Sequence, residues 1–302
     1  MGPGAEYVRE RPALAYPGWG DSGRDHRAAA NLRAGRMPGT GMDTARPGQA
    51  PRHIDGLPHG LSGALGNLGQ RADGLWHHAL TVQPLPPRWL VLGTGMLALA
   101  VVVSSRAWPR ARTVVTIVHE GGHALVALAT GRRLAGVRLY RNTAGETVSA
   151  GRADGPGIAL TTAAGYPAPS LLGLGAAALL AVGHLTGMLL LSLVLLAGLA
   201  VAVRNAYGML AVLVTAGAIT AVCLFAPAVV QAGFGYVMTW FLLLGGVRPV
   251  IELRRERRRG RTRRSDADQL ARLTWVPGGA WVMIFGVVAV AALAVSARWL
   301  VR

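Results

Sequence analysis

The chain has 302 residues, of which 52% are hydrophobic and only 15% are charged. Soluble domains rarely combine these two values, so the composition favours a membrane protein. The formal net charge is +17, from 31 basic and 14 acidic residues. In a soluble protein this balance would suggest a nucleic-acid partner. Here no nucleic-acid motif accompanies it, and orientation in an anionic membrane explains arginines placed between apolar runs. The single cysteine, Cys223, excludes an internal disulfide and a thiolate zinc cluster.

Residues 1–86 form a basic tail rich in Gly and Pro, with no sustained hydrophobic period. Such a segment cannot bury enough apolar surface to offset its chain entropy, so we expect it to be disordered. Residues 87–302 are mostly Leu, Val, Ala and Gly in long runs and form the second part of the chain.

The second part is predicted to be an all-α, polytopic bundle of six or seven transmembrane helices. A helix needs about 20 apolar residues to cross the hydrocarbon core of a bilayer. Seven segments approach this length, two of which meet at Ala226-Pro227: 89–107, 112–131, 158–181, 185–203, 206–224, 229–247 and 274–297.

Arginine distribution predicts the orientation of these spans. The densest basic loop, residues 248–264, should be cytoplasmic by the positive-inside rule. Counting back through seven spans also puts Arg204, the arginines of residues 132–141 and the basic tail inside. Arg106, Arg110 and Arg112 are the exception, because this count puts them outside.

The second predicted span contains the sequence His119-Glu120-Gly121-Gly122-His123. Residues i and i+4 share a helix face, so both imidazoles can bind one zinc ion. Glu120 is then placed to act as general base toward a zinc-activated water. It is also the only acidic residue within the seven predicted spans, where ionisable groups are costly and usually functional. The structural alternative is a pair of packing histidines hydrogen-bonded to Glu120.

A catalytic zinc requires a third protein ligand. Asp266 and Asp268 immediately precede the last span and are the first candidates. The alternatives are that both only cap that helix, or that one caps it while its neighbour binds the metal. Either aspartate reaches the zinc only if the last helix begins near residue 264, as a long helix that tilts or bends at Pro277. The remaining candidates are Glu146, Asp154, Glu252, Glu256 and His184. Among these, Asp154 is the ligand to test if neither Asp266 nor Asp268 faces the histidines.

Two further stretches suggest local structure near this motif. Residues 165–169, Gly-Tyr-Pro-Ala-Pro, predict either a broken helix or a helix whose first turn contains proline. A broken helix beside a zinc site would expose backbone for pairing with an unwound substrate. Residues 146–149 alternate weakly, as a hairpin strand does, and suggest an edge strand near the site.

The segment His119–Gly131 resembles the zinc motif of site-2-protease-like intramembrane metallopeptidases, in particular their short, peptidase-like membrane branch. Weaker similarities occur at residues 164–169, at Arg204-Asn205, and at residues 265–267 followed by Leu273-Thr274. The resemblance covers roughly residues 88–298. In well-studied members the third ligand is an aspartate in an Asn/Pro-rich motif ending in Asp-Gly on a later span. That motif is missing here, and the resemblance transfers its role to Asp266 first and to Asp268 second.

The resemblance implies an intramembrane zinc endopeptidase that hydrolyses peptide bonds of membrane-anchored regulatory proteins. Its cofactor would be Zn²⁺, its location the cell membrane with a cytoplasmic N-terminal tail, and its surroundings the lipid bilayer. The alternatives are a non-catalytic membrane scaffold and a small transporter. A transporter should carry charged residues in several spans, whereas here the predicted spans concentrate them in essentially one.

Overall fold

The computed structural model describes residues 66–67, 69–71, 73–74, 77–260 and 265–302, all within one of the two units of the chain, Ile54–Arg302. Most of the predicted disordered tail therefore lies outside the described residues. Gln83, at the end of that predicted tail, does have defined partners, because its backbone N–H donates to the carbonyl of Gly183 at 2.8 Å. The elements are α2 (Arg88–Val103), α3 (Trp108–Ala129), β1 (Arg133–Leu139), β2 (Gly145–Ala150), α4 (Pro156–Ala163), α5 (Ala168–Ala181), α6 (Leu185–Ala202), α7 (Ala206–Phe225), α8 (Ala228–Arg258), α9 (Asp266–Thr274) and α10 (Gly278–Leu300).

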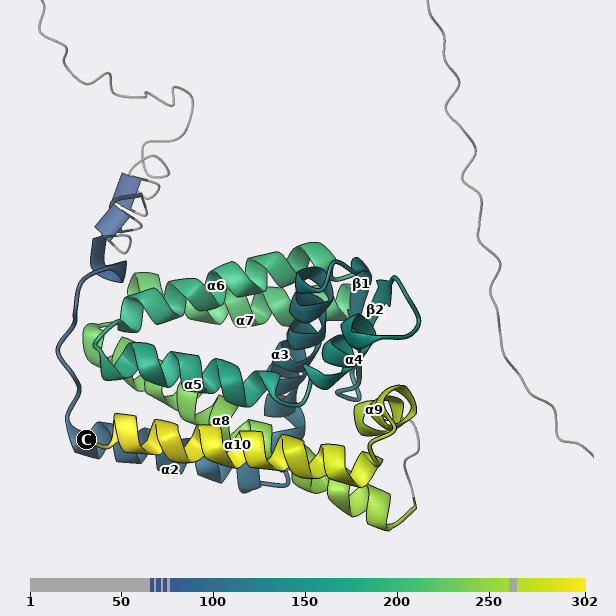
Figure 1. The fold of residues 1–302 in the computed structure, drawn as a ribbon. Helices are drawn as coiled ribbons and strands as arrows, with labels where there is room; N and C mark the ends of the chain where they lie inside the picture. Colours follow the sequence, from purple (N-terminus) through teal and green to yellow (C-terminus); the bar gives the residue numbers. More distant parts are fainter. Residues whose placement is uncertain (1–65, 68, 72, 75–76, 261–264) are drawn as a thin grey trace, which may run out of the picture. The chain divides into compact units, whose positions relative to one another are not determined.

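A helical membrane bundle is confirmed, with four to six candidate spans among the described residues where six or seven were predicted. Four of the described helices, α6, α7, α8 and α10, are long and apolar enough to cross a bilayer. Two bent pairs, α2–α3 and α4–α5, raise the number to six if each pair is one span. The two pairs bend by 102° and 69°, and Figure 1 shows α3 running across the other long helices. The segment 112–131 is therefore not a separate seventh span.

Local chemistry explains both bends. Between α2 and α3 the hydroxyl of Ser104 accepts hydrogen bonds from the backbone N–H groups of Arg106 and Ala107. Proline then occupies the first turn of α3, where a missing N–H costs nothing. The bend between α4 and α5 also contains proline. Pro167 precedes α5 and a second proline lies in the first turn of α5, so α4 does not continue through this segment. Both predictions for residues 165–169 thus hold together: the helix breaks, and proline begins the next one.

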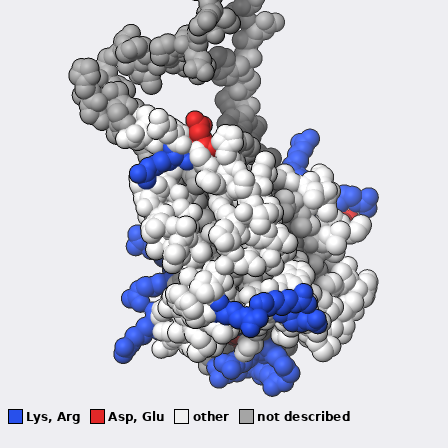
Figure 2. Space-filling model, turned by 90° about the vertical axis from the view of Figure 1, so that its left-hand side faces the viewer, with Lys and Arg blue, Asp and Glu red and all other residues white. Residues whose placement is uncertain are grey.

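The long helices have two ends with different composition. The far end gathers the start of α2, the α5–α6 and α7–α8 junctions and the end of α10, and Arg88 there donates to the carbonyl of Arg302. The site end gathers the α2–α3 bend, the hairpin, the α6–α7 junction, the end of α8, and α9. Uncharged side chains make up most of the surface seen from the far end (Figure 2).

The prediction that Arg106 and Arg112 lie on the outer side, opposite the other arginines, is wrong. Arg106 and Arg112 do not lie on the side opposite the basic end of α8. Arg112 pairs with Glu252 of α8 at 3.0 Å, and Arg248 of α8 donates to the carbonyl of Val102 at the end of α2. The apparent exception arose because α3 was counted as a complete crossing of the membrane.

The strand prediction for residues 146–149 is confirmed, and the fold is therefore not purely helical. β1 and β2 pair antiparallel, with Val137 opposite Thr147. The other edge of β1 is occupied, because Val137 forms a parallel bridge with Val203 and the amide of Asn205 bonds the backbone of Leu139 in both directions. Among the described residues, the open edge of this sheet belongs to β2.

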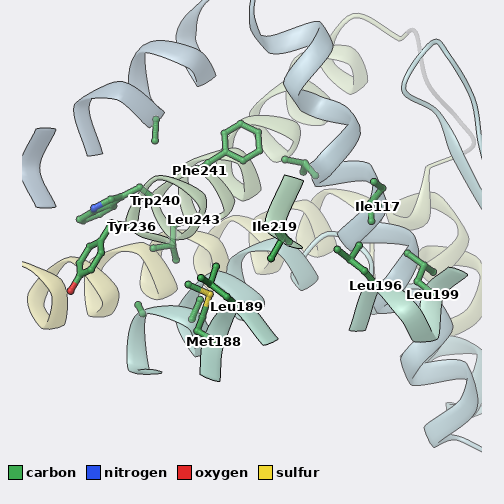
Figure 3. Close-up of a cluster of buried hydrophobic side chains, with 14 of the residues drawn as sticks. Ile117, Met188, Leu189, Leu196, Leu199, Ile219, Tyr236, Trp240, Phe241 and Leu243 are labelled. Carbon is green, nitrogen blue, oxygen red and sulfur yellow. The ribbon is translucent and has the colours of Figure 1, made fainter. Parts of the chain in front are cut away.

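The hydrophobic core lies between the long helices. Figure 3 shows Met188 and Leu189 of α6 near Leu243 of α8, with Ile219 of α7 beside them. Large apolar side chains also point outward along the helices, for example Met96, Val194 and Met283, each more than half exposed. Such a surface is suited to lipid and not to water.

Candidate metal centre

The motif residues lie in the middle of α3, where helical spacing places them as predicted. His119 and His123 are one turn apart, and their Nε2 atoms are 3.1 Å from each other. His123 and Glu120 are buried within the protein. Buried ionisable groups are costly without a partner, so each of these side chains requires one.

Asp266, the first residue of α9, supplies the partner of both histidines. One carboxylate oxygen, Oδ2, lies 3.3 Å from the Nε2 atom of His119 and 3.3 Å from that of His123. Of the groups of His, Cys, Asp and Glu in the described residues, these three side chains have the spacing of a metal site. The juxtaposition agrees with the expectation that helix begins near residue 264, although not with one continuous last helix. α9 ends at Thr274; the next residue, Trp275, has a left-handed backbone with φ 62°, and Pro277 precedes α10.

The chemistry of this donor set fits a zinc ion. The Nδ1 atom of His123 lies 2.7 Å from the carbonyl of Thr161 and donates to it, which leaves the Nε2 lone pair of the neutral ring directed at Asp266. Asp266 Oδ2 is buried and accepts no hydrogen bond from the described residues. Two imidazole nitrogens and one carboxylate oxygen thus converge, as the ligands of a catalytic zinc do.

Asp268 does not join this group. Its carboxylate accepts hydrogen bonds from the backbone and hydroxyl of Ser265, forming a capping box, and pairs with Arg257. Burial alone would raise the pKa of Asp268, but these partners hold it below its usual value. One aspartate therefore caps α9 while its neighbour faces the histidines.

The other candidate ligands have different surroundings. Asp154 is exposed and pairs with Arg152 at 3.5 Å. Glu252 pairs with Arg112 and Arg248, and Glu146 accepts a hydrogen bond from the hydroxyl of Tyr140 at 3.2 Å. His184 lies at the start of α6, at the far end of the bundle.

Glu120 faces the hairpin and a cavity. The hydroxyl of Thr147 in β2 lies 2.6 Å from Glu120 Oε2, to which it donates. The cavity is lined by the side chains of His119, Glu120, His123 and Asp266, together with Thr147 and Gln269. A molecule that enters it thus meets the carboxylate of Glu120 and the three convergent side chains together.

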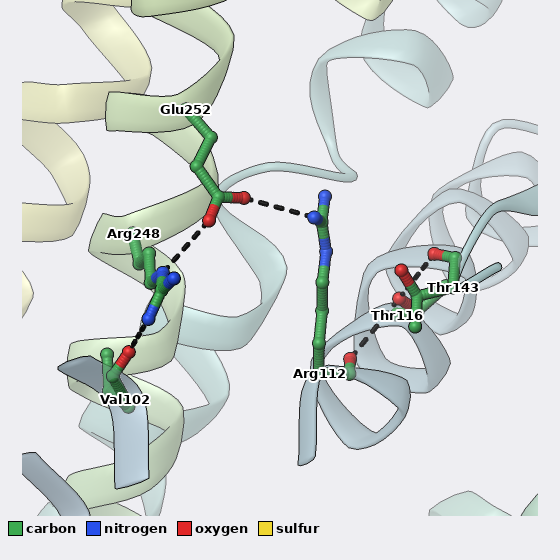
Figure 4. Close-up of polar contacts among 6 residues, drawn as sticks. All are labelled: Val102, Arg112, Thr116, Thr143, Arg248 and Glu252. Atoms are coloured by element: carbon green, nitrogen blue, oxygen red, sulfur yellow. Dashed lines mark hydrogen bonds and ion pairs between the residues drawn. The ribbon is translucent and has the colours of Figure 1, made fainter. Parts of the chain in front are cut away.

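A second polar cluster fixes the start of α3 (Figure 4). Glu252 pairs with Arg112 of α3 at 3.0 Å and with Arg248 of its own helix at 2.9 Å. The hydroxyl of Thr116, one turn after Arg112, lies 3.0 Å from the carbonyl of Thr143 in the hairpin turn. α3 is therefore tied to α8 on one side and to the hairpin on the other.

Sequence reasoning missed the residues that orient the motif. Thr147 lies in the predicted edge strand and Thr161 in a predicted span, but neither pattern assigns a role to its side chain, and only tertiary contact does so. The signal at residues 165–169 was visible, but it predicted only a break in a helix. In the structure, a Cβ atom on Gly165 would lie 2.7 Å from His119 Cε1 and closer still to His123 Nε2.

Comparison with known proteins agrees with this geometry. The family model for Peptidase M50B-like proteins matches residues 92–296, which contain α3, the hairpin and α9. No match was found among curated proteins or among solved structures.

Proposed function

Because the chain belongs to the Peptidase M50B-like family, we propose that it is an intramembrane zinc metalloendopeptidase. One observation carries the proposal: Asp266 Oδ2, buried without a hydrogen bond among the described residues, lies 3.3 Å from both histidine Nε2 atoms. Groups that only pack would be expected to satisfy that oxygen with a donor. A cation bound by all three side chains satisfies it instead.

In the proposed reaction, each of these residues has a separate role. His119, His123 and Asp266 would hold the zinc. When bound, the ion would lower the pKa of a water toward neutrality and polarise the peptide carbonyl. The carboxylate of Glu120 would take a proton from the attacking water and pass it to the amine nitrogen that departs when the peptide C–N bond breaks. Thr147 holds Glu120 toward the cavity through its hydrogen bond, so the base does not have to be ordered during the reaction.

The substrates we propose are membrane-anchored proteins, unwound near the site and cleaved there. The edge of β2 is open among the described residues, and Gly145 and Thr147 of this strand line the cavity. An extended segment that adds to such an edge gains backbone hydrogen bonds without sequence specificity. This arrangement suits a protease that must hold unwound transmembrane chain.

For the location, we infer the cell membrane with the site end of the bundle in the cytoplasm. The site end carries the arginines of residues 254–259 and of the hairpin, and the positive-inside rule assigns such an end to the cytoplasm. Arg88, the first residue of α2, lies at the far end of the bundle. The predicted cytoplasmic N-terminal tail rested on an odd number of spans, and with α2 and α3 counted as one bent pair this support is lost.

Metal analysis combined with hydrolysis tests the proposal. Purified protein should hold about one zinc per chain, and Asp266→Asn should lower the zinc content while the matched variant Asp268→Asn retains it. Glu120→Gln should retain zinc and lose cleavage of co-expressed membrane proteins, which should accumulate. A metal-free wild type would overturn the proposal. A scaffold or a transporter would be indicated if Glu120→Gln left every membrane protein unchanged.

A further inference from the structure

The break between α4 and α5 touches both histidines of the motif. A Cβ atom built on Gly165 would approach the Nε2 atom of His123 to under 3.0 Å and would lie 2.7 Å from Cε1 of His119. Real Cβ atoms essentially never make contacts this close, so only glycine fits here without displacing an imidazole. The backbone of Gly165 therefore defines the space left to the two rings.

The next residue, Tyr166, supports the ring of His119. Their ring centroids are 5.0 Å apart in an edge-to-face arrangement. Tyr166 in turn stacks on Phe285 of α10, at 5.2 Å and an interplanar angle of 12°. The orientation of Tyr166 is thus fixed by a buried side chain from another helix.

The two histidines differ in what holds them. His123 is fixed by its hydrogen bond to Thr161. Among the described residues, the ring nitrogens of His119 have polar contacts only with His123 and Asp266, which are the groups that would share the metal. Packing against Tyr166 therefore orients the His119 ring, whereas a hydrogen bond orients the His123 ring.

The cavity does not reach this dipeptide. Glu120, Thr147 and Gln269 are among the residues that line it, whereas Gly165 and Tyr166 are not. Substrate that enters through the cavity meets the metal-binding side chains from another side. Gly165 and Tyr166 are thus suited to shaping the metal site and not to contacting substrate.

We propose that Gly165 and Tyr166 are positioning residues, which hold the rings of His119 and His123 in place and thereby set the affinity of the metal site for the ion. The inference rests on the proposed zinc site. Partners of metal ligands typically change metal affinity by about 10–100-fold when they are removed. Loss of the Tyr166 ring should have an effect of that size, because this ring packs edge to face against His119, whose polar contacts among the described residues are with groups that would share the metal.

Metal binding without catalysis tests this proposal. Affinity for Zn²⁺ is measured by competition with a chelator, and the visible spectrum of the Co²⁺-loaded protein reports ligand geometry. Tyr166→Leu should weaken Zn²⁺ binding about 10–100-fold and change the Co²⁺ spectrum, whereas Tyr166→Phe keeps the ring and should match the wild type. Gly165→Ala should weaken binding as well. Its control is Gly175→Ala in α5, where a Cβ atom meets nothing within 4 Å.

The outcomes separate this inference from the proposed function. A wild type that binds no metal contradicts the zinc site itself. A wild type that binds metal, together with Tyr166→Leu of equal affinity and unchanged Co²⁺ spectrum, overturns the supporting role alone. If Gly165→Ala does not fold, the comparison of Tyr166→Leu with Tyr166→Phe decides, because the two differ in the ring that contacts His119.

Discussion

The two central glycines of the motif should respond differently to the same substitution. A Cβ atom on Gly122 would meet the Cβ of Ala168 at under 3.0 Å and the carbonyl oxygen of Ala164 at 3.0 Å. A Cβ atom on Gly121 has its nearest neighbour, in Leu199, at 3.9 Å, which is an ordinary contact. Gly122 therefore allows α3 to approach the α4–α5 break, and Gly121 has no comparable role.

The size of the effect follows from these contacts. Carbon atoms pack favourably at about 3.5–4.0 Å, so Gly122→Ala must separate α3 from Ala168 by more than about 1 Å. Overpacking of this kind costs about 1–3 kcal/mol. Replacing glycine with alanine in a helix gains about 0.5–1 kcal/mol, but this gain is common to both variants. The difference between Gly122→Ala and Gly121→Ala thus isolates the steric cost and should be about 1–3 kcal/mol.

Reversible unfolding in mixed detergent micelles, with SDS as the denaturant, measures this difference. Zn²⁺ affinity should fall in parallel for Gly122→Ala, since the displaced segment lies between Glu120 and His123. Equal unfolding free energies and equal Zn²⁺ affinities for the two variants would refute the reasoning, because they would mean that α3 does not approach the break as closely as the structure has it.

Two further predictions concern the general base and the orientation. Thr147→Val removes a hydrogen bond to the carboxylate of Glu120, an interaction worth about 1.5–3 kcal/mol. We therefore expect kcat to fall about 10–100-fold with zinc content unchanged, while Thr147→Ser keeps most activity; an unchanged kcat in Thr147→Val would contradict this role. For orientation, His184→Cys and Arg272→Cys are introduced in a Cys223→Ser background. In intact cells an impermeant thiol reagent should label the cysteine at 184 and not the one at 272, and the reverse pattern would show that the bundle is inverted.

Much of this protein could be predicted from local sequence. The helix bounds lie within a few residues of the predicted apolar runs for α6, α7 and α10, because a bilayer core demands about 20 apolar residues in succession. The shared face of His119 and His123 follows from helix geometry alone. Both inferences depend on residues close together in the chain, and for this reason they did not need the fold.

Other features were decided only by tertiary structure. The segment 112–131 has the composition of a span, yet α3 turns by 102° from α2, and contacts from Glu252 and Thr143 hold it across the bundle. Asp266 and Asp268 are two residues apart and chemically equivalent in sequence. Since α9 turns one toward the histidines and the other toward Arg257 and Ser265, only the packing of α9 distinguishes the candidate ligand from the cap. Apolar pattern and spacing are local properties of a chain, whereas the choice of Asp266 over Asp268 depends on two histidines that are more than 100 residues away along the chain.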